Sequence, residues 1–369
     1  MSKAAELANL IGNINAGGGG VNRNVIINGA MNIAERSTSE TGLGADADSY
    51  HTIDRWKLAA GNTAGRLTMT QDSSAPSGFA NSLKLDCTTA DTSIAAGEYL
   101  ILRQNIEAQN LQGFAKGTSD AKPFALSFYV KGNASATYVA ELVGDDVSRA
   151  ISKTFSVTTD WTRVELTYPA DTTGVINDDN GIGLYLNMWL HAGSTYTGGT
   201  SLSTTWGSIT HNERAVGISS FFDSTDRTFF LTGVQLEVGQ NPTEFEHEPY
   251  ERTLAKCQRY YRQWVSADST TGGSYTRIGI GVAQGSNVGV AQIALSPRMR
   301  ANPSASTTGQ LQAYNGNNLA DCDAAIDAAT APYLALIGIS NTSGFSVAQP
   351  VELICKNSAA NTFALSAEL

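Results

Sequence analysis

The stretch Arg227–Trp264 reads RTFFLTGVQLEVGQNPTEFEHEPYERTLAKCQRYYRQW, and the rest of the chain is organised around it. Its first part, Phe229–Val238, is rich in aromatic and β-branched residues whose side chains alternate between two faces, which predicts a half-buried β-strand. A glycine and a proline then end the strand. Tyr250–Tyr261 contains no glycine or proline and carries apolar residues at helical spacing, which predicts a short helix. Because the character of the chain changes here, we predict a domain boundary within this stretch.

Short alternating segments fill the chain before this stretch. Clusters of Gly, Asn, Asp and Ser separate them, and no long helical pattern intervenes. Many closely spaced strands without helices between them predict an antiparallel sandwich or barrel. The predicted strands are Val25–Ile27, Ile53–Ala59, Leu67–Gln71, Leu83–Cys87, Tyr99–Ile106, Phe124–Lys131, Tyr138–Val143, Ile151–Val157, Thr162–Tyr168, Ile182–His191, Ala215–Phe222 and Phe229–Val238.

A second series of strands follows the predicted helix. Two of them flank the sequence Gln-Gly-Ser-Asn, which is typical of a hairpin turn. We therefore predict a smaller C-terminal β-sandwich. Its predicted strands are Thr276–Ala283, Val288–Leu295, Leu311–Tyr314, Tyr333–Ile339, Val351–Lys356 and Phe363–Leu369.

Composition limits the possible partners. The 369 residues carry a net charge of -10, so there is no basic surface for a nucleic acid. No apolar run approaches the roughly 18 residues that span a bilayer, and Glu6, Asn9 and Asn13 interrupt any signal-peptide core. We therefore expect a protein that is made in the cytoplasm, stays soluble, and binds neither nucleic acid nor membrane.

The four cysteines are widely separated in the sequence. They are Cys87, Cys257, Cys322 and Cys355, and no two form a CxxC pair. This spacing is typical neither of zinc fingers nor of a disulfide framework, so we predict four buried free thiols.

Several segments resemble known families. TGVQLEVGQNPTEFEHEPYERTLAKCQRYY resembles the segment that closes the large β domain of many tailed-bacteriophage virion proteins, which include tail fibres, head fibres and other structural proteins. NVIINGAMNIAERSTS followed by SYHTIDRW resembles the start of that domain, and FALSAEL resembles its last strand. EYLILRQNIEAQNLQGF, KPFALSFYVKG and DWTRVELTYP resemble the jelly-roll carbohydrate-binding modules of polysaccharide-degrading enzymes. These resemblances imply a jelly roll in a phage particle assembled in the host cytoplasm.

Strand Ile182–His191 carries the candidate binding residues. Its even positions are apolar and are expected to face the core, so its odd positions face outward. Two aromatic rings beside an amide and an imidazole suit the partly apolar faces and hydroxyl edges of a sugar. The candidate carbohydrate-binding residues are Tyr185, Asn187, Trp189 and His191, with Tyr129 from strand Phe124–Lys131, which we expect in the same sheet. Alternatively, a neighbouring subunit or the loop Ala192–Glu213, with Tyr196 and Trp206, covers this face.

The first residues form a short apolar stripe. Leu7, Leu10, Ile11 and Ile14 lie on one side of a predicted helix, and Gly17–Gly20 follows directly. Such a short helix is marginal alone in water, so we expect it to attach the chain to another virion protein or to hold a homotrimer together. The alternative is a tail that folds back onto its own domain.

Signatures of catalysis are missing from the sequence. It contains no GxSxG, HExxH, Walker or EF-hand pattern, and its four histidines are isolated from one another. Carboxylate pairs such as Asp145–Asp146 and Asp178–Asp179 are typical of solvated turns, with calcium as the alternative. We therefore predict no catalytic residue, no metal and no cofactor.

The predicted architecture is all-β, with a jelly-roll sandwich, a smaller C-terminal β-sandwich and a short N-terminal helix. The predicted segments are an attachment or trimerisation helix and glycine hinge over 1–20, a jelly-roll domain over 21–249, a linker helix over 250–264 and a C-terminal β domain over 265–369. The resemblance implies a tail fibre, or a tail-fibre-like appendage, that adheres to a host-surface glycan. A head fibre or capsid decoration protein is the alternative, followed by a glycan depolymerase.

Overall fold

The computed structural model of the chain describes residues 2–15, 22–45, 48–266, 276–340, 342–356 and 361–369. The chain divides into two compact units, Met1–Thr253 together with Leu369, and Leu254–Glu368. The division falls inside helix α3 (Tyr250–Gln258). This helix is shorter than the linker helix predicted over 250–264, because strand β14 (Tyr261–Val265) begins within that range.

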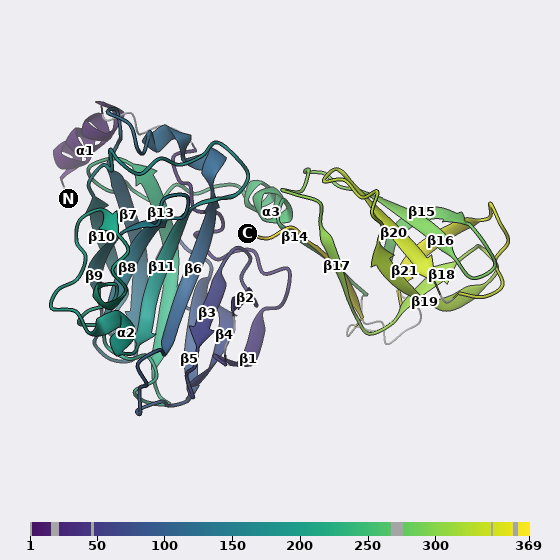
Figure 1. Ribbon diagram of the computed structural model, residues 1–369, viewed down its shortest axis with the longest axis horizontal. Helices are drawn as coiled ribbons and strands as arrows, with labels where there is room; N and C mark the ends of the chain where they lie inside the picture. Colours follow the sequence, from purple (N-terminus) through teal and green to yellow (C-terminus); the bar gives the residue numbers. More distant parts are fainter. Residues whose placement is uncertain (1, 16–21, 46–47, 267–275, 341, 357–360) are drawn as a thin grey trace. The chain divides into compact units, whose positions relative to one another are not determined.

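The first unit is a jelly-roll sandwich of two antiparallel sheets, which confirms the all-β fold class (Figure 1). Side chains from both sheets form one core. The six-stranded sheet runs in the order β1 (Ser39–Leu43), β4 (Arg66–Asp72), β5 (Ser82–Thr89), β13 (Thr228–Val238), β7 (Phe124–Gly132) and β10 (Thr162–Tyr168). The seven-stranded sheet runs in the order β12 (Gly207–Ser208), β9 (Arg149–Val157), β8 (Ala136–Gly144), β11 (Ile182–Ala192), β6 (Tyr99–Glu107), β3 (Lys57–Gly61) and β2 (Asp48–Tyr50).

Strand β13 contains a bulge that the sequence pattern did not reveal. The register of β13 against β7 shifts in the middle of the strand, where Gly233 has a φ of 63°. The core therefore receives Phe229 and Leu231 before the bulge but Val234 and Leu236 after it. Glycine is needed at this position, because the backbone is left-handed and a Cβ would lie 2.7 Å from the ring of Phe79.

The other face of β13 is also buried, which corrects the prediction of a half-buried strand. Gln235 and Glu237 are buried there. The backbone N–H of Thr243 donates to Glu237 Oε1 at 2.7 Å, and Gln235 Nε2 donates to the carbonyl of Glu244 at 3.2 Å. The extended segment after β13 thus folds back over the strand and satisfies its buried polar groups.

Two predicted strands are irregular segments. In Val25–Ile27, the first N–H donates to the carbonyl of Leu236, but the next two donate to the side chains of Asn24 and Gln104. Ala215–Phe222 is also irregular, because its amides bind carbonyls of two different strands, β8 and β11. Neither segment makes the continuous ladder of backbone bonds that defines a strand.

The second unit is a β domain that differs in form from the predicted sandwich. Six strands close into a barrel, which removes the exposed sheet edges that a sandwich would leave (Figure 1). A three-stranded sheet of β14, β22 (Thr362–Ser366) and β17 (Ser304–Thr308) completes the unit. The barrel strands, in order, are β15 (Thr276–Ala283), β16 (Gly289–Ala294), β20 (Leu334–Ser340), β19 (Leu319–Ile326), β18 (Leu311–Tyr314) and β21 (Pro350–Cys355).

The first unit also contains short helices, one before the strands and the others between them. The N-terminal helix α1 spans Lys3–Asn15, and no helix among the described residues is long and apolar enough to cross a membrane. The others are η1 (Ala108–Phe114), α2 (Ser194–Thr197) and η2 (His211–Glu213). All four cysteines are buried, as predicted, and none of them forms a disulfide bond with another described residue.

A buried ion pair joins the turn after η1 to the segment after β10. Lys116 Nζ lies 2.9 Å from Asp171 Oδ2, and both side chains are almost completely buried. Arg149 donates to both carboxylate oxygens of Asp171, at 3.0 and 2.9 Å. Burial alone would raise the pKa of Asp171, but the hydrogen bonds from Arg149 and Lys116 outweigh it and hold this pKa well below its usual range.

Candidate functional site

Strand β11 presents two different faces, as its period-two pattern predicted. Leu184, Leu186, Met188 and Leu190 lie in the core between the sheets. The alternate side chains lie on the outer face of the seven-stranded sheet, where Trp189 belongs to a separate small apolar cluster. The predicted sugar contacts would therefore lie on this outer face.

Tyr129 does not share a sheet with the other candidates. It lies on β7 in the six-stranded sheet, while β11 lies in the seven-stranded one. The Tyr129 ring contacts Phe79 at a centroid distance of 5.4 Å. The expectation that both strands belong to one sheet was therefore wrong, because local alternation does not determine which sheet a strand joins.

His191 also leaves the predicted outward row. The register of β11 against β6 shifts between Trp189 and His191, so that His191 pairs with Leu100. Opposed residues of an antiparallel pair project from the same face, and Leu100 lies in the core. The His191 ring accordingly lies 5.3 Å from that of Phe222, another core residue, and is completely buried.

Trp189 does lie on the outer face, but it is covered. Its side chain is 1% exposed, and its ring centroid lies 5.0 Å from that of Tyr196 on α2. Ala215 and Ile218 complete the cover. The segment after β11 thus covers this part of the sheet, which was the alternative considered for Tyr196. Trp206 lies elsewhere, at 5.8 Å from the ring of Phe124.

A buried carboxylate organises the polar side chains beneath this cover. Glu141 on β8 is fully buried. Its Oε2 accepts hydrogen bonds from Asn187 Nδ2 at 2.9 Å, from Trp189 Nε1 at 2.8 Å and from Arg214 Nη2 at 2.7 Å. Arg214 Nε also donates to Oε1 at 2.7 Å, and its guanidinium lies 4.8 Å from the centre of the Trp189 ring. These bonds fix Asn187 and Arg214 in place.

Beyond the covered part, the outer face opens into a hollow of about 210 Å³ beside Tyr185. We call it the Tyr185 hollow. Arg103 Nε donates to Asn187 Oδ1 at 2.7 Å, and the Arg103 guanidinium lies 4.8 Å from the centre of the Tyr185 ring. The hydroxyl of Tyr185 donates to Asp145 Oδ1 at 2.8 Å. The residues that line it are Arg103, Val143, Gly144, Asp145, Ser148, Tyr185, Asn187, Ile209 and Arg214.

The charges of the hollow are unequally neutralised. Arg214 is bound by Glu141, whereas no described carboxylate forms an ion pair with Arg103. Burial, followed by the hydrogen bond to Asp145, raises the pKa of Tyr185 to about 12, so the phenol stays neutral at physiological pH. The hollow thus offers a neutral ring, a guanidinium with unused donors and a carboxylate, side by side.

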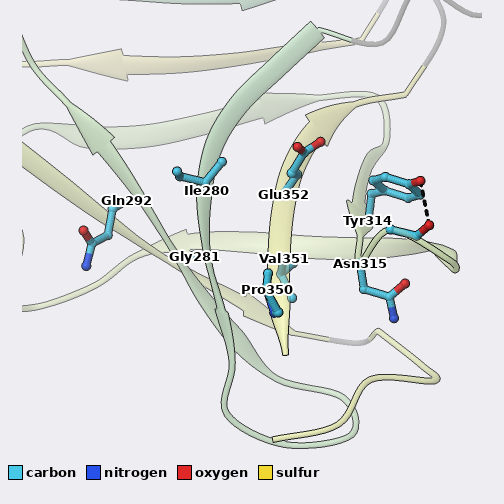
Figure 2. Close-up of a pocket in the computed structure, with 9 residues that line it drawn as sticks. Ile280, Gly281, Gln292, Tyr314, Asn315, Pro350, Val351 and Glu352 are labelled. Atoms are coloured by element: carbon cyan, nitrogen blue, oxygen red, sulfur yellow. Dashed lines mark hydrogen bonds between the residues drawn. The ribbon is translucent and has the colours of Figure 1, made fainter. Parts of the chain in front are cut away.

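A larger hollow, of about 510 Å³, lies in the second unit (Figure 2). A row of opposed residues on four adjacent barrel strands crosses it: Gln292, Ile280, Glu352 and Tyr314. Ile280 is 67% exposed, and the hydroxyl of Tyr314 donates to the carbonyl of Gly316 at 2.9 Å. We call it the barrel hollow.

Helix α1 carries the predicted assembly residues. Leu7 and Ile11 lie in this helix and are 57% and 49% exposed, respectively. The side chains of Leu10 and Ile14 lie outside the described part of the structure, as does the predicted hinge Gly17–Gly20. Leu7 and Ile11 thus leave apolar surface available for a partner.

The site also contains Arg103, Glu141, Asp145 and Arg214. None of these four residues was predicted from the sequence to bind a sugar. Glu141 had a usable signal, because it is the only charged residue of its strand, whereas Arg103 shares β6 with other polar residues and a second charge, Glu107. Arg103 and Glu141 each lie directly opposite Asn187 in the register of β11. Asp145 and Arg214 come from loops: the sequence marked Asp145 only as one of a carboxylate pair in a turn, and nothing in its local sequence distinguished Arg214.

No family model matches this chain, and no curated protein matches it. Among solved structures, the chain is similar to one of CBM4, with 12% identity and a TM-score of 0.30 over 57% of this chain and 97% of that one. The enzymatically active domain of tailspike protein 4 of bacteriophage CBA120 matches with 14% identity and a TM-score of 0.29, over 58% of this chain and 21% of that one. The family 11 carbohydrate-binding module of Clostridium thermocellum, solved with a β-1,3-1,4-mixed-linked tetrasaccharide, matches with 12% identity and a TM-score of 0.27, over 57% and 99%.

Proposed function

We propose that this chain is a non-catalytic glycan-binding protein of a tailed-phage particle, and that the sugar binds in the Tyr185 hollow. The observation that carries the proposal is the combination of one half-buried ring with fixed polar groups at its edge. The closing segment TGVQLEVGQNPTEFEHEPYERTLAKCQRYY resembles phage virion proteins. This resemblance supports a role in a phage particle, as a tail fibre or a tail-fibre-like appendage.

The chemistry of the hollow suits a pyranose. The Tyr185 ring can stack against the C–H face of the sugar, and Ile209 adds an apolar wall. Arg103 provides donors that point in fixed directions, because Asn187 holds its Nε and Glu141 holds Asn187. Asp145 accepts from a sugar hydroxyl at the same rim. Groups that are already held in place lose little entropy when the ligand binds.

A single hollow of this size is expected to bind a sugar weakly, so several copies held together would bind a glycan more tightly. We propose that α1 joins three copies into a homotrimer or attaches the chain to another virion protein. Presenting several sites together raises the apparent affinity by roughly 10²–10⁴ where the geometry allows simultaneous binding. Exposed Leu7 and Ile11 on α1 support this role.

The second candidate function is that of a head fibre or capsid decoration protein with a structural role. The burial of Trp189 and His191 favours it, because the residues best suited to a sugar are used to hold a cover in place. A depolymerase is the third candidate. The most buried carboxylate of the site, Glu141, is bound by three donor side chains, which leaves it poorly suited to act as a proton donor.

A glycan array of bacterial surface polysaccharides tests the proposal. The parent chain should bind at least one glycan, and Tyr185→Ala should weaken that binding by roughly tenfold, about 1.4 kcal/mol. Tyr333→Ala, which removes a ring that is 61% exposed in the second unit, is the matched control and should bind like the parent. Tyr314→Ala reports on the barrel hollow.

Three results would count against the proposal. If the parent binds no glycan, the structural role takes first place. If Tyr314→Ala loses binding while Tyr185→Ala retains it, the barrel hollow is the site instead. Release of reducing ends from the bound polysaccharide would refute the non-catalytic part.

A further inference from the structure

Three buried side chains meet at one end of the sandwich. Asp91 and Glu98 belong to the loop between β5 and β6, and His191 lies near the end of β11. Each is at most 5% exposed. One carboxylate oxygen from each acid and one ring nitrogen of His191 all lie within 4.8 Å of one another. This cluster is separate from the Tyr185 hollow and has no part in the proposed sugar binding.

Two atoms of the cluster are buried without a hydrogen-bond partner. They are His191 Nε2 and Glu98 Oε2, and they lie 3.5 Å apart. On the other side of the ring, His191 Nδ1 lies 2.8 Å from Ser220 Oγ. If Nδ1 carries the proton and donates it to Ser220, Nε2 directs a lone pair at a carboxylate oxygen. Two acceptors then face each other in a site closed to bulk water.

The charge of the cluster is also unbalanced. Among the described residues, no Lys or Arg forms an ion pair with Asp91 or Glu98. Buried carboxylates are either paired with a cationic group or bound to a metal ion. A divalent cation in the middle of the cluster would supply the missing positive charge.

The distances fit a small divalent ion. Two ligand atoms that each lie about 2.0–2.1 Å from a tetrahedral zinc ion are roughly 3.3–3.4 Å apart. His191 Nε2 and Glu98 Oε2 are separated by 3.5 Å. Asp91 is held by Thr63 Oγ1 at 2.9 Å and by the Ala64 N–H at 2.8 Å, both to Oδ2. A carboxylate oxygen that accepts such bonds still has capacity for a metal.

We propose that Asp91, Glu98 and His191 bind one divalent transition-metal ion, with Zn²⁺ the best match. One imidazole and two carboxylates are ligands that zinc accepts, whereas calcium prefers oxygen ligands alone. Ser220 acts in support, because its hydroxyl fixes the His191 tautomer that leaves Nε2 free to bind the metal. Water completes the coordination.

The ion would connect segments that are far apart in the sequence. It ties the β5–β6 loop to β11, and through Ser220 to the segment that covers Trp189. Removing the metal should therefore loosen this cover and lower the thermal stability of the first unit. The alternative is a metal-free cluster in which Nε2 carries the proton and makes a long hydrogen bond to Glu98, while Ser220 donates to Nδ1.

The test uses the full chain without a histidine tag, stripped with a chelator and then titrated with ZnSO₄. We expect one zinc ion per chain by calorimetry and elemental analysis, with a rise in melting temperature. Glu98→Gln should weaken zinc binding by more than about 100-fold, and Ser220→Ala by roughly 10–100-fold. His211→Gln replaces an exposed histidine outside the cluster and should bind like the parent. Asp91→Asn replaces Glu98→Gln if the latter does not fold.

Several results would overturn the proposal. The first is that the metal-free parent binds no stoichiometric zinc. The second is that Glu98→Gln or Asp91→Asn binds zinc as tightly as the parent, and the third is that the parent binds Ca²⁺ but not Zn²⁺. Cobalt(II) provides a readout that depends on no substitution. The proposal expects the intense visible absorption of a four-coordinate site, and the weak absorption of a fully hydrated ion would refute it.

Discussion

Replacing Trp189 by alanine should destabilise the first unit by about 3–5 kcal/mol. The side chain is 1% exposed beneath the segment that follows β11. A buried indole withdraws on the order of 200 Å² from water, which corresponds to about 5 kcal/mol at roughly 25 cal/mol per Å². Alanine keeps a small part of that burial and the cover relaxes somewhat into the cavity, so the expected loss lies slightly below this figure.

A second variant separates packing from hydrogen bonding. Trp189→Phe keeps most of the ring but removes the Nε1–H that donates to Glu141 at 2.8 Å. Glu141 retains its donors on Arg214 and Asn187, so it is not left unsatisfied. The cost of this change should therefore be only about 1–2 kcal/mol. Trp189→Ala should exceed it by a clear margin.

Urea denaturation followed by circular dichroism measures both losses. The two compact units need not unfold together, so the transition of the first unit must be assigned before free energies are compared. Leu353→Ala, in the core of the second unit, identifies the other transition. Tyr333→Ala is the exposed control and should change stability by less than about 0.5 kcal/mol. A loss below about 1 kcal/mol for Trp189→Ala would show that the cover does not seal this ring.

Two further predictions concern a buried charge and the assembly. Asp171→Asn leaves Lys116 buried without its partner and should cost about 3–5 kcal/mol at pH 7. Because the folded-state pKa of Asp171 is depressed, its contribution is present above the unfolded pKa of about 4 and disappears as the pH falls through the folded pKa. Stability measured from pH 5 downward should therefore fall less steeply in Asp171→Asn, and parallel curves would contradict this. Leu7→Asp with Ile11→Asp should convert a trimeric parent to monomers in light scattering without unfolding the sandwich; a monomeric parent that still enters particles would remove any role for α1.

The strand pattern was predictable where apolar residues alternate with period two along the sequence. The bounds of β10, β15 and β18 agree with the sequence prediction. Strands with little apolar content escaped it: β17 reads SASTT and is mostly exposed, and β19 alternates small and charged residues. In these strands the backbone ladder, rather than side-chain burial, holds the strand in its sheet, and that ladder leaves no hydrophobic signal.

The candidate site was predictable only in part. The outward row on β11 followed from alternation as far as Trp189 and failed at His191, because the bulge between them is a tertiary feature. That Trp189 is covered depends on where the following loop folds. The grouping of His191 with Asp91 and Glu98 joins residues roughly a hundred positions apart in the sequence, and no spacing rule addresses such a group.

The order of strands has a consequence for how this protein is made. Among the described strands, each sheet and the barrel contain a late strand between two earlier ones: β13 between β5 and β7, β11 between β8 and β6, β22 between β14 and β17, and β21 between β15 and β18. Because the chain is synthesised from its N-terminus, the three sheets each stay in two separate parts, and the barrel stays an open sheet, until that strand emerges. A nascent chain that ends before Thr228 still exposes the edges of β5 and β7, which can pair with other nascent chains. Rapid, uninterrupted translation and chaperone holding should therefore raise the yield of soluble protein more than any increase in the stability of the finished fold.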